Sequence, residues 1–285
     1  MKKKTKIAII ICSIVLVLAI VLGVLIISRI PMGEKLDMNK FALTFEDDFE
    51  SELDRTVWSG HYQYGEKTEA RKGCFWNQYI AYTENGNLII PVKYLEDGMG
   101  EAGAGWYSAG IDTDGDAANG FSQKYGYFEC RCILPKGADI WSAFWLMNDG
   151  VYNEDGFGKD GTEIDIFESD CYGDFLENSI TSNLHIDGYG DAHDMLGAKQ
   201  FITGNNPYEE FNTYGFEWNE KEYIFYINGR ETFRTDFGGV SENPEYLILS
   251  VEMKGENGIP SERENAKGGE AEFVVDYVKV YQYKN

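Results

Sequence analysis

The sequence predicts an all-β fold, a sandwich of two antiparallel sheets, preceded by one transmembrane helix. Short runs rich in β-branched and aromatic residues recur along the chain, and clusters of Gly, Asn and Asp separate them. No long helical pattern follows the N-terminal region. Aromatic residues make up 15% of the chain, which suits the shared core of two packed sheets.

The N-terminal segment has the pattern of a membrane anchor. Residues 7–27 are apolar, without charge or proline, and about 20 such residues span a bilayer as a helix. Four lysines precede this run, so the positive-inside rule places the remainder of the chain outside the cell. A cleaved signal peptide is the alternative, but its apolar core is usually shorter, and no good small-x-small cleavage site follows. We expect an uncleaved signal-anchor at residues 1–29, a short stalk at 30–40 and one domain at 41–285.

The exported part is strongly acidic. Without the five basic residues of the anchor region it retains 20 Lys and Arg against 48 Asp and Glu, a formal charge near −28. Nucleic acid is excluded as a partner because its binding needs a basic surface. Strongly anionic glycans are disfavoured for the same reason, whereas a neutral polymer is not repelled. We expect a monomer.

The cysteines leave the redox state open. Cys12 lies in the membrane segment, and Cys74, Cys130, Cys132 and Cys171 lie in the exported part. Cys130 and Cys132 share a strand face and are poorly placed to pair with each other. Four cysteines allow three pairings, and the sequence does not choose among them. No Cys-x-x-Cys or His-rich spacing predicts a zinc site.

The expected strands follow one another through the domain. The turn signal Asn228-Gly229 predicts a hairpin between one of them and the chain that follows. The strand-like runs are residues 41–45, 87–93, 125–134, 140–147, 162–167, 179–186, 214–218, 223–227, 246–253 and 272–283.

Three carboxylates near the middle of the chain are the main candidate for catalysis. Glu163 and Asp165 lie two apart on the strand expected at 162–167, so they share a face. Glu168 would face the apolar side of a regular strand, where a lone carboxylate is costly, and one β-bulge would return it to the face of the other two. Mutual repulsion should raise the pKa of at least one of the three, as a general acid requires. An exposed polar strand face is the alternative interpretation.

Two further strands each have a face that suits sugar binding. Trp141 and Trp145 share one side of residues 140–147, and Asn183 and His185 share one side of residues 179–186. If both strands pack beside the carboxylate strand, these side chains line one concave sheet. Aromatic faces and clustered hydrogen-bonding groups suit sugar rings. Core packing of the tryptophans and a structural role for His185 are the alternatives.

Successive motifs of the chain resemble those of glycoside hydrolase family 16, in the order of that family. The resemblance covers about residues 43–283 and implies a β-jelly-roll sandwich with a long substrate cleft. The motifs are Phe45-Glu-Asp-Asp-Phe49 with the later Trp58, Lys124-Tyr-Gly-Tyr-Phe-Glu129, Leu134-Pro-Lys-Gly137, Trp141-Ser-Ala-Phe-Trp-Leu146, Glu163-Ile-Asp-Ile-Phe-Glu168, His185-Ile-Asp-Gly-Tyr189 and Asp276-Tyr-Val-Lys-Val-Tyr281.

The resemblance also implies roles for individual residues. Glu163 matches the nucleophile, Asp165 the assisting carboxylate and Glu168 the acid/base. The bulged motif is similar to that of laminarinases, agarases, carrageenases and related endo-galactanases, and it departs from the unbulged form of lichenases and plant xyloglucan transglycosylases. The resemblance places Trp141, Trp145 and His185 in the cleft. Arg71 is similar to a cleft arginine.

No cofactor is expected for catalysis, but a structural calcium ion is possible. Many members of the family bind one on the convex side, and Glu46, Gly86 and Asp276 are the matching positions. The alternative for Asp276 is an ordinary surface strand residue.

These observations together predict a membrane-anchored, extracellular endo-β-glycosidase that acts with retention on a polysaccharide or glycan. A β-1,3-glucan is the first choice of substrate, and a β-galactan or a host O-glycan is the second. A cell-wall transglycosylase and a non-catalytic carbohydrate-binding sandwich compete with this interpretation. A binding module of this kind would be expected to have lost one of the two glutamates, and both are present.

Overall fold

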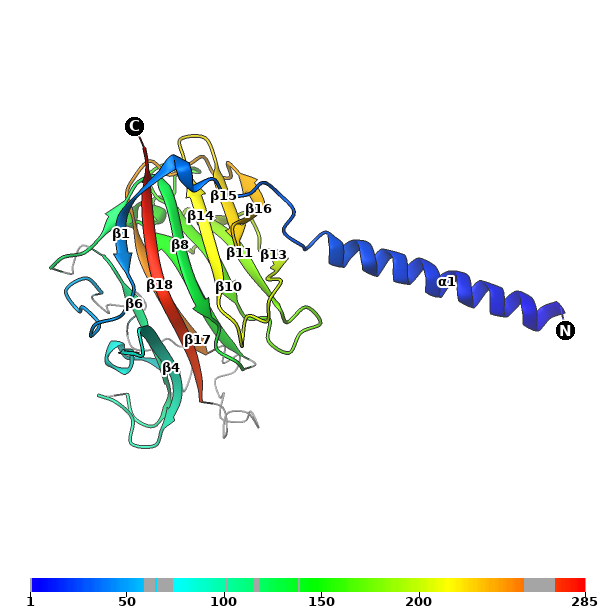
Figure 1. The fold of residues 1–285 in the computed structure, drawn as a ribbon, viewed down its shortest axis with the longest axis horizontal. Helices are drawn as coiled ribbons and strands as arrows, with labels where there is room; N and C mark the ends of the chain where they lie inside the picture. Colours follow the sequence, from blue (N-terminus) through cyan, green and yellow to red (C-terminus); the bar gives the residue numbers. More distant parts are fainter. Residues whose placement is uncertain are drawn as a thin grey trace.

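The protein consists of one long N-terminal helix and a two-layered β-sandwich (Figure 1). The computed structural model describes residues 2–58, 65, 74–100, 102–114, 118–137, 139–253 and 270–284. The predicted cleft residue Arg71 lies outside these residues. Helix α1 spans Lys2–Ile27, and the short 3-10 helices are η1 (Met38–Lys40), η3 (Gln78–Ile80) and η4 (Asp149–Tyr152).

The first sheet forms the outer layer, in front in Figure 1, and carries both ends of the domain. Its neighbouring strands are antiparallel except β2 and β5, which are parallel. Its path is β16 (Arg230–Thr235), β15 (Tyr223–Ile227), β14 (Asn212–Trp218), β8 (Gly126–Ile133), β18 (Ala271–Tyr283), β4 (Asn87–Leu95), β5 (Gly105–Ser108) and β2 (Cys74–Trp76), with β1 (Phe41–Asp47) paired to β18 and β3 (Tyr82–Glu84) to β4.

The second sheet holds the strands that the sequence analysis singled out. Its path is β12 (Asp194–Met195), β11 (Ser179–Ile186), β10 (Glu163–Ser169), β9 (Ile140–Met147), β17 (Glu245–Met253) and β6 (Gly110–Asp112), with β13 (Lys199–Ile202) paired to β11 and β7 (Ser122–Gln123) to β17. The carboxylate strand β10 lies between β9 and β11 and is antiparallel to both. The predicted jelly-roll sandwich is confirmed.

The core lies between the two sheets because each strand turns its apolar side inward. Phe144 of β9 and Phe167 of β10 are fully buried in it, together with Phe128 and Phe216 of the first sheet. The rings of Phe167 and Tyr214 pack against each other between the two sheets, and their centroids lie 4.4 Å apart. Because these rings are closely packed in the core, they hold strand β10 rigidly on its core side.

The strand predictions hold best where the alternation is long. Residues 140–147, 179–186 and 223–227 form strands with the predicted bounds, and the other predicted runs are strands whose ends differ by a few residues. The predicted hairpin joins β15 to β16, with positive φ of 50° at Asn228 and 68° at Gly229. The shorter strands, such as β6 and β12, were not predicted because two to four residues carry too little pattern.

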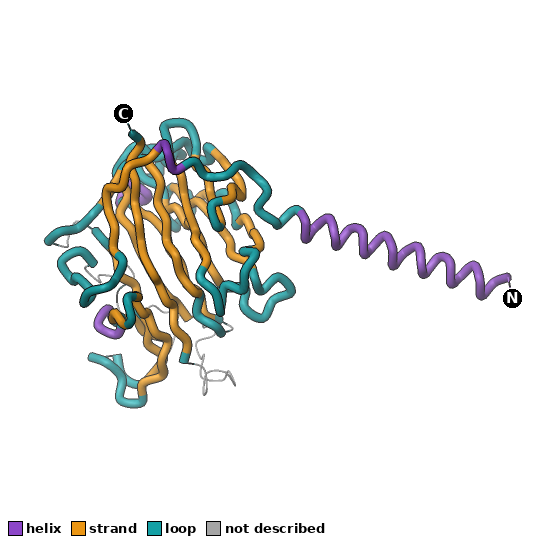
Figure 2. Tube along the Cα trace, in the orientation of Figure 1, coloured by secondary structure: helices purple, strands orange, loops and turns teal. Residues whose placement is uncertain are grey.

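The N-terminal region matches the sequence prediction only in part. Within α1, the segment Ile9–Ile27 has a mean hydropathy of 3.5, and none of it is buried against the domain. It is long and apolar enough to cross a membrane, a property that signal sequences share. Residues 30–40, where we expected a short stalk, lie along the sandwich and make backbone hydrogen bonds with β16 and with Gly229 before it (Figure 2).

None of the four cysteines of the sandwich domain takes part in a disulfide. Cys74, Cys130, Cys132 and Cys171 are all buried, and none of the three pairings left open by the sequence is formed. Burial raises the pKa of the Cys130 thiol, which also contacts Cys132. Cys74, Cys130 and Cys132 belong to the hydrophobic core, whereas Cys171 accepts a hydrogen bond from Gln200.

Candidate active site

A β-bulge in β10 brings the three carboxylates to one face. Against β9, Asp165 pairs with Trp145 and Phe167 with Phe144, so Ile166 is the extra residue on the bulged strand. The bulge turns Phe167 into the core and returns Glu168 to the side of Asp165. The predicted bulge is thus confirmed.

The neighbouring strands complete a pocket of about 330 Å³ on the exposed face of the second sheet. The predicted strands β9, β10 and β11 do pack side by side. The pocket is lined by Trp141, Ala143, Trp145, Glu163, Asp165, Glu168, Asn183, His185, Tyr189, His193, Ser250 and Glu252. Every predicted catalytic and cleft residue that the structure describes therefore lies at one site.

The carboxylates are held in an environment that opposes ionisation. The exposed fraction of Glu163 is 8% and that of Asp165 is 4%. Burial raises the pKa of Asp165 to about 8, and burial together with the charge of Asp165 raises the pKa of Glu163 to about 8. Burial, followed by the charges of Asp165 and Glu163, raises the pKa of Glu168 well above its ordinary value. The three groups together therefore retain at least one proton near neutral pH.

Glu163 differs from the other two carboxylates by its hydrogen-bond donor. The phenolic hydroxyl of Tyr189 donates to Glu163 Oε2, and this bond lowers the pKa of Glu163 against the effect of burial. His185 lowers the pKa of both Glu163 and Glu168 through its charge. Tyr189 and His185 thus both favour the anion of Glu163, against burial and the charge of Asp165.

His185 lies at the centre of a polar network beside the carboxylates. Its Nε2 lies 3.3 Å from Asp165 Oδ2 and 3.8 Å from Glu163 Oε1. Its Nδ1 lies 2.8 Å from His193 Nε2, and its Nε2 lies 2.8 Å from Asn183 Nδ2. Asn183 Oδ1 is buried without a hydrogen-bond partner among the described residues.

The two predicted tryptophans contribute unequally to the pocket. Trp145 is only 5% exposed, packs with Met147 and Ile248, and donates its indole N–H to Ser250 Oγ at 3.1 Å. Trp141 is half-buried and presents more of its ring to the pocket. Trp141 is therefore the better candidate for stacking on a sugar ring.

Five pocket residues were not assigned to the site from the sequence: Ala143, Tyr189, His193, Ser250 and Glu252. Tyr189 ends the motif that begins at His185, but nothing in that motif tells which way the loop after β11 turns. Ser250 and Glu252 alternate with apolar residues on β17, a signal that would have placed them on one face. Their pairing with Ala143 and Trp141 of β9 depends on strand order, which alternation does not give.

The structure gives other partners to the residues predicted to bind calcium. Glu46 Oε1 lies 2.7 Å from Lys279 Nζ, and Asp276 forms an ion pair with Arg131. The carboxylate of Glu50 approaches Gly86. Because both predicted carboxylates already neutralise a basic side chain, the set as placed does not fit a calcium site. Binding of calcium there stays an untested prediction.

One cluster in the described part of the chain has the spacing of a metal site. Ligand atoms of Glu163, Asp165 and His185 lie within 4.8 Å of one another. All three belong to the pocket described above.

Comparison with known proteins places the chain among carbohydrate-active enzymes. A family model described as "Beta-porphyranase A-D, GH16 domain" matches residues 41–283. Among curated proteins, the endo-1,3-1,4-β-glycanase EglC of Rhizobium meliloti is 28% identical over 69% of this chain and 38% of its own length. The glucan endo-1,3-β-glucosidase of Cryptopygus antarcticus is 24% identical over 71% of this chain and 77% of its own length. The chain thus spans about two fifths of the length of the Rhizobium relative.

Solved structures with the same architecture agree with this result. The catalytic domain of the endo-1,3-β-glucanase (laminarinase) of Thermotoga petrophila superimposes with a TM-score of 0.67. It is 28% identical, and the match covers 88% of this chain and 100% of that domain.

Proposed function

The chain belongs to glycoside hydrolase family 16, and from this premise we propose that it is an endo-β-glycosidase that hydrolyses a β-1,3-glucan with retention of configuration. The observation that carries the proposal is the bulge at Ile166, which places Glu163, Asp165 and Glu168 on one face of a rigid strand. A regular strand would direct Glu168 into the core and leave a single pair of acids in the pocket.

The proposed mechanism has two displacements. Glu163 attacks the anomeric carbon and forms a glycosyl-enzyme, while Glu168 gives its proton to the leaving glycosidic oxygen. Glu168 then takes a proton from water, whose oxygen attacks the same carbon and releases Glu163. Asp165 lies between the two and raises the pKa of each through its charge.

The choice of β-1,3-glucan is supported by the named relatives and by charge. The Cryptopygus and Thermotoga proteins are both named for β-1,3-glucans, and a neutral glucan is not repelled by an acidic domain. A β-galactan is the second candidate, since the matching family model is named for β-porphyranases. The strong negative charge disfavours heavily anionic forms of such a polymer.

Two other functions compete with hydrolysis. A transglycosylase would use the same carboxylates and pass the glycosyl-enzyme to a sugar hydroxyl instead of water. A non-catalytic sandwich that only binds carbohydrate would not require either glutamate to give or accept a proton. The retained pair of glutamates and the hydrogen bond that Tyr189 donates to Glu163 favour catalysis over simple binding.

We also propose that α1 remains attached as a signal-anchor and holds the domain outside the cell. The lysines that precede the apolar run favour this orientation, and the length of Ile9–Ile27 suffices to span a bilayer.

A substrate panel tests the activity. The exported domain would be incubated with β-1,3-glucan, mixed-linkage glucan, agarose, galactan and mucin glycans, and released oligosaccharides would be separated by size. We expect internal cleavage of β-1,3-glucan, with the β-anomer as the first product by NMR. Release of oligosaccharides from galactan alone would show that the substrate is a galactan and not a β-1,3-glucan. An α-anomer as the first product would refute retention. Products longer than the substrate in the presence of an acceptor sugar would identify a transglycosylase.

A further inference from the structure

The chain that follows the apolar helix is bound to the sandwich almost at once. Helix α1 ends at Ile27, and the carbonyl oxygen of Arg29 accepts a hydrogen bond from Ile202 N at 2.8 Å. Arg29 Nη1 donates to Gln200 O at 3.2 Å. Two residues of extended chain span at most about 7 Å. Strand β13 therefore lies directly at the end of the helix.

The next residues extend the first sheet at its edge strand β16. Gly33 N donates to Glu231 O at 3.0 Å, Glu231 N to Glu34 O at 2.9 Å, and Leu36 N to Gly229 O at 3.0 Å. A Cβ added at Gly33 would lie 2.7 Å from Glu231 Cβ, so the close approach requires glycine at this position. These bonds satisfy backbone groups that an open sheet edge would leave unpaired.

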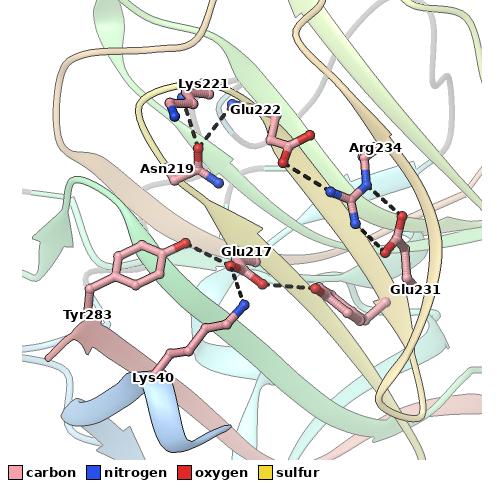
Figure 3. A network of polar contacts seen from close by, with 9 residues as sticks. Lys40, Glu217, Asn219, Lys221, Glu222, Glu231, Arg234 and Tyr283 are labelled. Atoms are coloured by element: carbon pink, nitrogen blue, oxygen red, sulfur yellow. Dashed lines mark hydrogen bonds and ion pairs between the residues drawn. The ribbon is translucent and has the colours of Figure 1, made fainter. Parts of the chain in front are cut away.

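A polar network fastens the end of this segment to the outer sheet (Figure 3). Lys40 Nζ lies 3.7 Å from Glu217 Oε1, and Glu217 is buried. The hydroxyls of Tyr283 and Tyr226 donate to the two oxygens of Glu217 at 2.9 and 2.8 Å. Residues 29–40, which we call the docked segment, are thus held at their beginning, middle and end.

The docked segment lies where the two sheets close on each other. Phe201 of β13 and Phe233 of β16 stack with ring centroids 5.8 Å apart, and Phe225 stacks on Phe233 at 4.5 Å. Strands β13 and β16 accordingly lie on the side of the sandwich from which α1 departs (Figure 1). Because these rings pack between the layers, the edge is a rigid part of the domain.

We propose that this edge, formed by residues 29–36 with β13 and β16, rests on the lipid bilayer that holds α1 and contacts its headgroups. The inference depends on the signal-anchor proposed above. The link between α1 and β13 is too short to lift the domain from the surface. Ile30 and Met32, which are 43% and 67% exposed, lie where apolar groups can enter the interface.

The charge of this edge also suits phospholipid headgroups. Lys35 forms a backbone β-bridge with Arg230 of β16, and Arg29 precedes them in the same docked segment. In a domain with more than twice as many acidic as basic residues, such a grouping is unusual. Basic groups at a membrane surface attract headgroup phosphates.

Contact of this edge with the bilayer orients the substrate pocket relative to the membrane. The pocket is lined in turn by β17, β9, β10 and β11, so its long direction crosses the strands. Strand β13 pairs with β11, whose Asn183 and His185 line the pocket. The β11 end of the pocket therefore lies nearer the bilayer, and a bound glycan would direct one end towards the lipid surface.

Site-directed fluorescence quenching tests the proposal in the full-length chain. A Cys12→Ser background would carry Met32→Cys, Lys199→Cys or Glu96→Cys, each labelled with a fluorophore. The protein would be reconstituted in phosphatidylcholine and phosphatidylglycerol vesicles that contain a headgroup-nitroxide lipid. We expect strong quenching at Met32 and Lys199 and little at Glu96, an exposed residue beyond β4 at the opposite side of the first sheet.

A flexible insertion provides the control. About 20 Gly and Ser residues between Ser28 and Arg29 add a reach of roughly 25 Å, and the difference in quenching between Lys199 and Glu96 should then become smaller. Equal quenching at all three positions without the insertion, or a difference that the insertion increases, would overturn the proposal. So would release of the domain from cells with an N-terminus near residue 30. None of these readings depends on turnover, so an inactive enzyme would not affect them.

Discussion

Tyr189 donates its phenolic hydrogen to Glu163 Oε2, and it is the direct hydrogen-bond donor that the structure gives to the proposed nucleophile. This bond lowers the pKa of Glu163, whereas burial and the charge of Asp165 raise it to about 8. The tyrosine therefore favours the anion of Glu163, against burial and the charge of Asp165.

Tyr189→Phe removes this hydrogen bond and keeps the ring. A hydrogen bond to a charged group contributes about 1.5–3 kcal/mol, so we expect kcat/KM to fall roughly 10- to 100-fold. Because the bond lowers the pKa of Glu163, its loss raises that pKa, and the acidic limb of the pH profile of kcat/KM should move to higher pH. The measurement uses a soluble oligosaccharide across the pH range.

Tyr152→Phe is the matched control for this variant. Tyr152 is half-exposed, and its ring lies 5.9 Å from that of Tyr189. The control removes the hydroxyl of a neighbouring tyrosine and should keep the pH profile of the parent. An unchanged acidic limb in Tyr189→Phe would contradict the role given to the tyrosine.

Glu245→Gln should flatten the dependence of stability on pH. Burial raises the pKa of Glu245 from 4.5 to about 8, so the folded state holds a proton that the unfolded state releases. Between these two values the folded state binds more protons, and the free energy of unfolding falls as pH rises. The effect amounts to a few kcal/mol at most. Thermal melts between about pH 5 and pH 8 measure the slope.

The exposed Glu242 provides the comparison for Glu245. It pairs with Lys159 at 3.6 Å on the surface, and Glu242→Gln should leave the slope unchanged. Part of the slope should survive in Glu245→Gln because the pKa values of Glu163 and Asp165 are raised in the same direction. A slope equal to that of the parent would show that Glu245 does not titrate as argued.

Deleting residues 1–28 should yield a soluble and folded domain, since the docked segment and the sandwich remain intact. Deleting residues 1–40 should also yield a folded domain, but one that melts at a lower temperature. Three backbone hydrogen bonds to β16 and the contact of Lys40 with Glu217 are lost. At about 1 kcal/mol for each hydrogen bond, less the entropy regained, we expect a fall of several degrees. Equal melting temperatures would show that the docked segment adds no stability.

The three carboxylates of the pocket could be predicted from their spacing, because successive side chains of a strand point to opposite faces. Glu163 and Glu168 are five residues apart, so only a bulge could place both on one face, and the cost of a buried carboxylate made a regular strand expensive. The order of β9, β10 and β11 in the sheet was assumed rather than derived, and the structure confirms it.

Residues outside regular strands could not be predicted in the same way. Tyr189 returns to Glu163 because Asp187 and Gly188 adopt positive φ of 61° and 68°, and no periodicity reports such a turn. The docked segment is held mainly by backbone hydrogen bonds, which any residue except proline can make, so its sequence resembled a free stalk. The basic partners of Glu46 and Asp276 lie far along the chain and gave no local signal.

A chelator should leave the melting temperature unchanged, because Glu46 and Asp276 already neutralise Lys279 and Arg131. Asp276→Ala should lower stability by no more than about 1 kcal/mol, the usual effect of a partly exposed ion pair. Calorimetry with and without added calcium measures both. A rise in melting temperature with calcium that is lost in Asp276→Ala would establish the calcium site that the sequence predicted.

Glu163→Ala and Glu168→Ala should both abolish turnover of a natural glycan, but azide should distinguish them. With an aryl β-glycoside the leaving group hardly needs protonation, so Glu168→Ala can still form the glycosyl-enzyme, and azide should release it as the β-azide. In Glu163→Ala azide enters the space of the missing nucleophile and should give the α-azide. NMR of the products reads the configuration. Asp165→Asn should keep weak activity, because Asp165 acts through its charge and forms no bond to a sugar carbon. An inverted product from Glu168→Ala, or complete loss of activity in Asp165→Asn, would reverse the proposed roles of these carboxylates.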